Sequence, residues 1–185
     1  GFPGGKLVAL AIQNGAAVWE APVASPKGTT ELDRVADIVT VPVIDGRQIC
    51  AVAFQGRVAC FDMGQGGALL WARDLSSAAG LAIDNRFVFV TDDRGAVHAL
   101  DRTSGASLWK QDKLLNRRVS GPAVQRGAVA VADGEGIVHF LSREDGSFVA
   151  RQKTDGSRVR TPVQAMGPGF LVQTTGGSVN LIEAQ

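Results

Sequence analysis

A short motif, glycine followed two residues later by valine, recurs along this chain at an almost constant spacing. It begins at Gly56, Gly95, Gly136 and Gly177, at intervals of 39, 41 and 41 residues. Apolar, β-branched runs lie between the copies, and a strand-rich repeat of about 40 residues is typical of blades arranged in a ring. Because one repeat is too small to bury its own apolar face, each repeat must pack against its neighbours. The repeat therefore limits the chain to an all-β array.

Each repeat divides into four apolar runs separated by glycine-rich turns, which predicts one four-stranded antiparallel blade. Three copies open on a proline (Pro42, Pro122 and Pro162), where the missing N–H does little harm. The predicted blades cover residues 39–75, 80–112 and 120–153, with a half blade at 1–20 and an incomplete blade at 160–185. Because propellers have up to eight blades and close by sharing strands between their ends, we expect a β-propeller fragment of about four and a half blades.

The charge distribution argues against a nucleic-acid partner. The chain carries 19 basic and 18 acidic residues, a formal net charge of +1, without long blocks of either sign. Binding to a phosphate backbone requires a concentrated basic surface. No run approaches the roughly 18 apolar residues of a membrane helix, and Gly1–Gly5 do not have the order of a signal peptide. Any export signal is therefore expected to lie outside this chain.

The sequence offers no clear catalytic motif. It contains neither a Gly-x-Ser-x-Gly elbow nor a Cys-x-x-Cys motif, and its acidic residues lie mostly at turns. His98 and His139 occupy matching positions in successive repeats. Two histidines without a carboxylate partner are a weak metal signal, so we interpret them as ordinary strand residues. We expect no enzymatic activity, no metal and no cofactor.

The two cysteines, Cys50 and Cys60, flank a short turn near Gly56. A two-residue turn would place Cys60 opposite Ala51 and direct the two thiols to opposite faces of the sheet. A connection with an odd number of residues would reverse this parity. The sequence leaves both arrangements open and favours two small buried side chains over a disulfide.

A tryptophan follows a turn glycine by four or five residues in three of the repeats. An aspartate can bind the turn amides, the glycine accepts a positive φ, and a tryptophan ring on the outer strand can cover the next blade. We expect this motif to dock neighbouring blades. Its residues are Trp19, Trp71, Asp101, Gly105 and Trp109, and Ala150 takes the tryptophan position in the third full blade.

The pattern Ala-x-Asp-x-x-Ser/Thr-Gly-x-x-x-Trp resembles the docking motif of the quinoprotein-type (PQQ-like) β-propellers. Three further segments, Thr29–Asp37, Leu114–Arg117 and Glu144–Lys153, are similar to the C-terminal half of the BamB family, the lipoprotein propellers of the outer-membrane β-barrel assembly (BAM) complex. This resemblance implies an eight-bladed ring on the periplasmic face of the outer membrane, anchored by an N-terminal lipid that this chain lacks. It also implies binding to the POTRA domains of BamA.

In a four-stranded blade, the loop before the first strand and the turn between the second and third strands open on one face. One loop on this predicted face is oversized, the connection from Ala21 to Thr40, and long loops on rigid scaffolds commonly carry function. Thr30 can cap a short helix predicted over Glu31–Ile38. The residues expected to contact a partner are Glu31, Asp33, Arg34 and Asp37, beside exposed Leu32, Val35 and Ile38. The resemblance places Asp37 at an acidic interface position of the family, and Val39 where relatives carry a second acid.

The expected function is a non-catalytic scaffold that binds BamA POTRA domains and assists the insertion of outer-membrane proteins. Unfolded segments of those proteins are a further expected partner, because exposed outer strands can accept an added strand. The alternative is a fragment of a PQQ-dependent dehydrogenase. That enzyme would need a calcium held by oxygen ligands next to the quinone, and the sequence does not supply such ligands convincingly.

Overall fold

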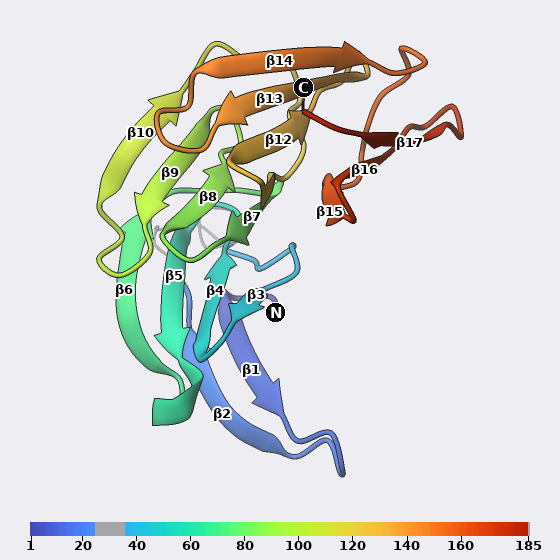
Figure 1. The fold of residues 1–185 in the computed structure, drawn as a ribbon. Coiled ribbons are helices and arrows are strands. Elements are labelled where there is room, and N and C mark those ends of the chain that lie inside the picture. The colour runs from blue at the N-terminus through green and yellow to red at the C-terminus, as the bar shows by residue number, and fades with distance from the viewer. Residues whose placement is uncertain (25–35, 185) are drawn as a thin grey trace. The chain divides into compact units, whose positions relative to one another are not determined.

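The computed structural model describes residues 1–24 and 36–184, and its regular elements are almost entirely β-strands (Figure 1). The described strands form one two-stranded, three four-stranded and one three-stranded sheet, each a meander of neighbours in sequence order. This confirms the predicted all-β class with four-stranded antiparallel sheets. Glu31, Asp33, Arg34, Leu32, Val35 and the Thr30 cap lie outside the described residues.

The sheets follow one another along the chain. The first consists of β1 (Lys6–Leu10) and β2 (Ala17–Pro22). The second consists of β3 (Val43–Asp45), β4 (Gln48–Val52), β5 (Arg57–Asp62) and β6 (Ala68–Asp74), with the single-turn helix η2 (Met63–Gln65) before β6. The third consists of β7 (Gly80–Ile83), β8 (Phe87–Thr91), β9 (Val97–Asp101) and β10 (Ser107–Gln111). The fourth consists of β11 (Ala123–Gln125), β12 (Ala128–Ala132), β13 (Ile137–Ser142) and β14 (Phe148–Lys153). The last consists of β15 (Gln164–Met166), β16 (Gly169–Gln173) and β17 (Val179–Ile182).

The described residues divide into two compact units. Those up to Ala78 and the turn Thr103–Gly105 form the first, and Ala79–Arg102 together with the residues from Ala106 onward form the second. In the second unit, β8 and β12 are buried at every position. Burial on both faces explains why these strands are continuous apolar runs and do not alternate.

The outermost strand of four sheets contains a β-bulge at one recurring position. The extra residue immediately precedes the tryptophan or its replacement, Ala150, so the register skips Val18, Leu70, Leu108 and Val149. All four bulged side chains are exposed, whereas Trp71 and Trp109 are buried. Because a bulge reverses the face that the next side chain occupies, it directs the tryptophan inward and interrupts the outer edge of the sheet.

The structure contradicts the favoured interpretation of the cysteines, because Cys50 and Cys60 form a disulfide. Val52 pairs with Val58, which leaves an odd number of residues in the connection and places Cys50 directly opposite Cys60. Their Cα atoms are 4.1 Å apart, and both side chains are fully buried. The two-residue turn was therefore the wrong assumption, since the hairpin closes through a longer connection.

No helix in the described part of the chain is long and apolar enough to cross a membrane.

Candidate functional site

Asp37 is the one predicted partner-binding residue that lies in the described part of the chain. Its main chain pairs with Phe54, at the end of the β4–β5 hairpin, through hydrogen bonds of 3.3 and 2.8 Å. Its Oδ1 accepts a hydrogen bond of 2.9 Å from the amide of Gly4. Among the described residues, Oδ2 has no hydrogen-bond partner. Asp37 is thus held in place by hydrogen bonds to two other segments of the first unit.

The residues around Asp37 correct two expectations for the long connection. Ala36–Ile38 include an extended bridge to Phe54, so the helix predicted over Glu31–Ile38 does not reach Ile38. Ile38 is only 7% exposed and belongs to the apolar core of the first unit, so it is not part of an exposed contact surface. Asp37 pairs with Phe54 of the following hairpin. A local capping pattern cannot reveal such a long-range contact.

The turns between second and third strands in the second unit share a capping device. Three residues before the repeat glycine, Asp92 and Asp133 each accept two backbone hydrogen bonds through Oδ1, at 2.9–3.0 Å. Thr174 occupies the same position in the last sheet and accepts one from the amide of Ser178. These side chains fix the turns that open on the predicted binding face.

Each of the two aspartates also binds the histidine six residues later. The His98 Nε2 lies 2.8 Å from Asp92, and the His139 Nε2 lies 2.9 Å from Asp133. Arg117, in the neighbouring loop, completes the second cluster by donating to Asp133 and Glu135. The interpretation of the histidines as ordinary strand residues missed these partners. The signal in the sequence was an aspartate six residues before each histidine.

Hydrogen bonding and burial shift the pKa values of this cluster. Burial alone would raise the pKa of Asp133, but hydrogen bonds from His139, Ile137, Arg117 and Glu135 outweigh it and hold the pKa below its ordinary value. Burial lowers the pKa of His139, although Asp133 acts in the opposite direction. The neutral ring therefore donates from Nε2 to the ionised Asp133, and its Nδ1 has no partner among the described residues.

We expect the stability of the second unit to fall as the pH decreases below about 6.5, the ordinary pKa of histidine. Because the pKa of His139 is lower in the folded state, the unfolded chain binds the proton more readily, and the His139 contribution is complete only above that pH. Urea unfolding at about pH 7.5 and about pH 5 measures the loss. His139→Asn introduces the residue that Asn180 supplies in the last sheet and should reduce the pH dependence. An unchanged pH dependence in this variant would remove His139 as its source.

The predicted docking tryptophans lie over turn glycines. A Cβ atom added to Gly67 would lie 2.6 Å from the Trp19 ring, one on Gly105 would lie 2.4 Å from Trp71, and one on Gly146 would lie 2.5 Å from Trp109. In the first unit, Arg73 Nε also donates to the Gly105 carbonyl at 2.6 Å. In the second, Trp109 Nε1 donates to the Arg143 carbonyl and Gln111 to the Gly146 carbonyl. Asp101 lies at the end of β9, and its amide donates to the Ala106 carbonyl.

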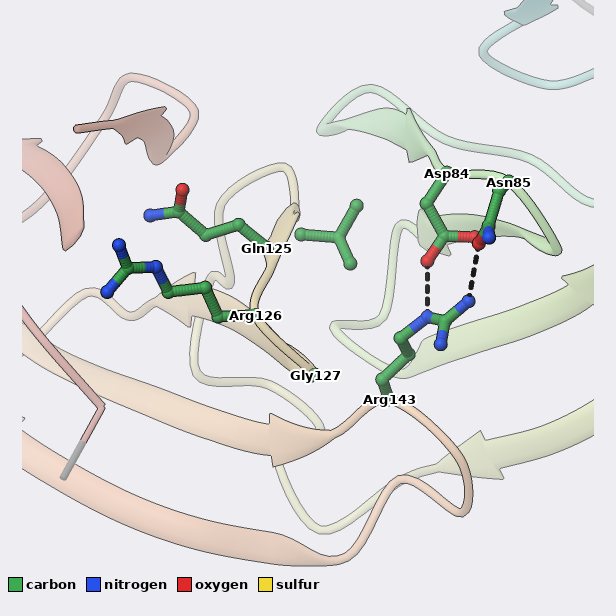
Figure 2. Close-up of a pocket in the computed structure, with 7 residues that line it drawn as sticks. Asp84, Asn85, Gln125, Arg126, Gly127 and Arg143 are labelled. Atoms are coloured by element: carbon green, nitrogen blue, oxygen red, sulfur yellow. Dashed lines mark hydrogen bonds and ion pairs between the residues drawn. The ribbon is translucent and has the colours of Figure 1, made fainter. Parts of the chain in front are cut away.

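A pocket of about 320 Å³ opens at the other ends of the strands in the second unit (Figure 2). The Arg143 side chain, following β13, reaches back to the β7–β8 turn, where it binds Asp84 at 2.5 Å and Asn85 at 2.7 Å. Burial would raise the pKa of Asp84, but Arg143 and the amides of Arg86 and Phe87 lower it overall. The lining residues are Asp84, Asn85, Val124, Gln125, Arg126, Gly127 and Arg143. No motif in the sequence predicted this pocket.

Within residues 1–24 and 36–184, no three His, Cys, Asp or Glu side chains gather closely enough to hold a metal ion. Asp–His and Asp–Arg contacts in the second unit stabilise turns and connect neighbouring sheets.

Comparison with known proteins identifies the family. The sequence profile described as "Outer membrane protein assembly factor BamB" matches residues 1–111. The chain is 47% identical to the protein of that name from Bordetella pertussis over 184 residues and 45% identical to that from Burkholderia pseudomallei over 179 residues. These alignments cover 100% and 97% of this chain but 48% and 47% of the relatives. The chain thus spans about half the length of the curated relatives it matches.

A solved structure supports the same assignment. The crystal structure of BamB from Moraxella catarrhalis superimposes with a TM-score of 0.88 at 29% identity, covering 95% of this chain and 52% of that one. The chain belongs to the BamB family of outer membrane protein assembly factors.

Proposed function

We propose that this chain is part of a non-catalytic scaffold that binds the POTRA domains of BamA and assists the insertion of outer-membrane proteins. The observation that carries the proposal is the position of Asp37 in a chain of the BamB family. The residue lies near the end of the oversized connection and is hydrogen-bonded to Phe54 and Gly4, and its Oδ2 has no hydrogen-bond partner among the described residues. A carboxylate fixed in this way suits a charged hydrogen bond with a cationic side chain of the partner.

The bulges in the outer strands favour the loops over the strand edges as the binding region. Strand addition requires a regular row of free N–H and C=O groups, and a bulge interrupts that row. The interruption occurs at Val18, Leu70, Leu108 and Val149. We therefore place the partner on the loops and do not extend the proposal to unfolded segments bound at these edges.

Asp37→Arg is expected to weaken binding to the isolated POTRA domains of BamA about tenfold or more, which corresponds to about 1.4 kcal/mol. The substitution replaces an attraction by a like-charge repulsion at a position fixed by the fold. Isothermal titration of the intact protein with the purified POTRA domains measures the affinity. Thermal unfolding of the same samples shows whether the fold is retained.

Two further variants make this result interpretable. Asp37→Asn keeps the acceptor for the Gly4 amide but removes the charge, so it separates partner binding from the local hydrogen bond. Asp45→Arg reverses the charge of another exposed acid, in the hairpin turn at the opposite end of the same sheet as Phe54, and should leave affinity unchanged. Equal affinities for the Asp37→Arg and unmodified proteins would exclude this loop from the interface.

The disulfide supports the proposed location on the periplasmic face of the outer membrane. Cys50 and Cys60 are bonded and fully buried. Disulfides form and persist in the bacterial periplasm, whereas the cytosol keeps most thiols reduced. We also propose that the full-length protein is attached to the membrane through an N-terminal lipid.

A further inference from the structure

We propose that the pocket beside Arg126 binds a carboxylate group. The pocket measures about 320 Å³ and lies within the second unit, at the lower end of the volumes typical of small-molecule sites, about 300–1,000 Å³. Its lining side chains include two arginines and one aspartate, a net charge of +1. This charge balance favours a monoanion.

Arg143 is not available for an incoming ligand. Its guanidinium donates to Asp84, Asn85 and Glu144, at 2.5, 2.7 and 3.0 Å, and it lies over the Phe87 ring. Asp84 is equally occupied, because it also accepts from the amides of Arg86 and Phe87. The side of the pocket formed by Asp84 and Arg143 is therefore a fixed ion pair whose two charges neutralise each other. The positive charge left for a ligand is that of Arg126.

Arg126 lacks the compensation that arginines in the corresponding turns have. Arg47, in the β3–β4 turn, pairs with Asp62, and Arg86, in the β7–β8 turn, pairs with Glu144. The Arg126 side chain is exposed and has no hydrogen bond or ion pair with any residue in the described ranges. In Figure 2 its side chain extends away from Arg143. A guanidinium with free donors fits a carboxylate in a bidentate arrangement.

The backbone at Arg126 is a second, independent observation. Gln125 pairs with Ala128, so Arg126 and Gly127 form a two-residue hairpin turn, and both have positive φ, 49° and 80°. The first position of such a turn favours Asn, Asp or Gly, and an arginine there is strained. Strained residues of this kind concentrate at functional sites. An arginine that costs stability and has no partner in the described fold is well explained by a ligand.

The other lining groups indicate the chemistry of the rest of the ligand. The Asn85 Oδ1 accepts from Arg143, which directs the Asn85 Nδ2 donor elsewhere. Gln125 Nε2 donates to the Gly169 carbonyl, which leaves its Oε1 as an acceptor. Val124 adds a small apolar surface. A carboxylate on a short apolar body with a nearby N–H or O–H donor matches this set, as does the C-terminus of a peptide. Because Arg126 supplies the one positive charge that is not compensated by the other lining residues, a dianion is disfavoured.

Titration followed by NMR of the side-chain amides of Asn85 and Gln125 tests the proposal, using the whole chain. The probes are butyrate, an acetylated tripeptide with a free C-terminus, the same tripeptide with an amidated C-terminus, and inorganic phosphate. We expect saturable shifts with a millimolar Kd for the free tripeptide, because ordering a flexible arginine opposes binding. The amidated tripeptide should give no saturation. Saturation by butyrate as well would assign the site to free carboxylates, and saturation by the tripeptide alone to a protein terminus.

Arg126→Asn separates ligand binding from stability. Asn-Gly is a favoured pair for this turn, so the variant should unfold at the same or a higher urea concentration, while Kd for the carboxylate rises at least tenfold. Arg47→Asn, in the turn whose arginine already has a carboxylate partner, is the matched control and should leave binding unchanged. Three results would overturn the proposal: no saturation by any carboxylate, tighter binding of phosphate, or full binding by the Arg126→Asn variant.

Discussion

Replacing Trp109 with alanine is expected to lower the free energy of unfolding of the second unit by about 3–5 kcal/mol, the usual cost of removing a large buried aromatic side chain. Trp109 is 9% exposed, and its ring centroid lies 5.8 Å from that of Phe89. Its Nε1 donates to the Arg143 carbonyl at 2.9 Å, and its ring covers Gly146. One substitution therefore removes a ring from the core and a hydrogen bond between neighbouring sheets. Urea unfolding followed by far-UV circular dichroism measures the change.

Two variants on the same strand set the scale of this effect. Leu108 is the bulged residue next to Trp109 and is 48% exposed, so Leu108→Ala should change stability by no more than about 0.5 kcal/mol. Trp109→Phe keeps an aromatic ring but loses the hydrogen bond to Arg143, and should fall between the two. If Trp109→Ala were as mild as Leu108→Ala, the tryptophan would not hold the sheets together.

The contact between Trp109 and Gly146 can be isolated by a double-mutant cycle. Gly146→Ala alone introduces a Cβ 2.5 Å from the Trp109 ring at a φ of 72°, so it carries both a steric clash and a backbone cost. In the Trp109→Ala background the clash is gone, and only the backbone cost of about 1–2 kcal/mol remains. The two substitutions should therefore be strongly non-additive, as expected for residues in direct contact. Additive effects would show that the ring does not depend on the glycine.

The repeat predicted the fold class because its information is local and occurs several times. The β-branched run Phe87–Thr91 and the turn glycine Gly95 each specify a strand or a turn from a few neighbouring residues, and the structure has β8 over Phe87–Thr91. The repeats also support one another's assignment. Where the strand pattern of one repeat is ambiguous, the equivalent segment of the next repeat shows whether it is a strand. Agreement between local strand and turn signals and the overall repeat is typical of sequences that encode one fold.

The features that the sequence did not reveal depend on register or on contacts between distant segments. Asp92 directly follows β8 and meets His98 of β9, which pairs with Val90, and Asp133 meets His139 in the same way after β12. Ile38 is buried because its segment pairs with Phe54. The pocket beside Arg126 joins turns that are about one repeat apart. The spacing of six residues indicates the two Asp–His pairs, but no spacing within one segment reveals the burial of Ile38 or the pocket.

The disulfide is the clearest case, because a single residue in the length of one connection decides whether it forms. Replacing both Cys50 and Cys60 with alanine is expected to lower the free energy of unfolding of the first unit by about 2–3 kcal/mol. The cysteines are ten residues apart, and a cross-link that closes a loop of this size removes that much conformational entropy from the unfolded chain. The slope of stability against urea concentration should rise, since the unfolded state becomes less compact.

The origin of this loss can be separated from packing. Cys50→Ala alone breaks the cross-link as completely as the double substitution, so the two variants should have similar stability, and the unmodified chain unfolded in the presence of a strong reductant should approach both. If the loss came from packing, the double variant would be less stable than Cys50→Ala, because each sulfur removed from the buried hairpin would lower the free energy of unfolding further. A double variant that unfolds at the same urea concentration as the unmodified chain would show that the β4–β5 hairpin is held by its register alone. The bond would then report the compartment in which the chain folds and contribute nothing to its stability.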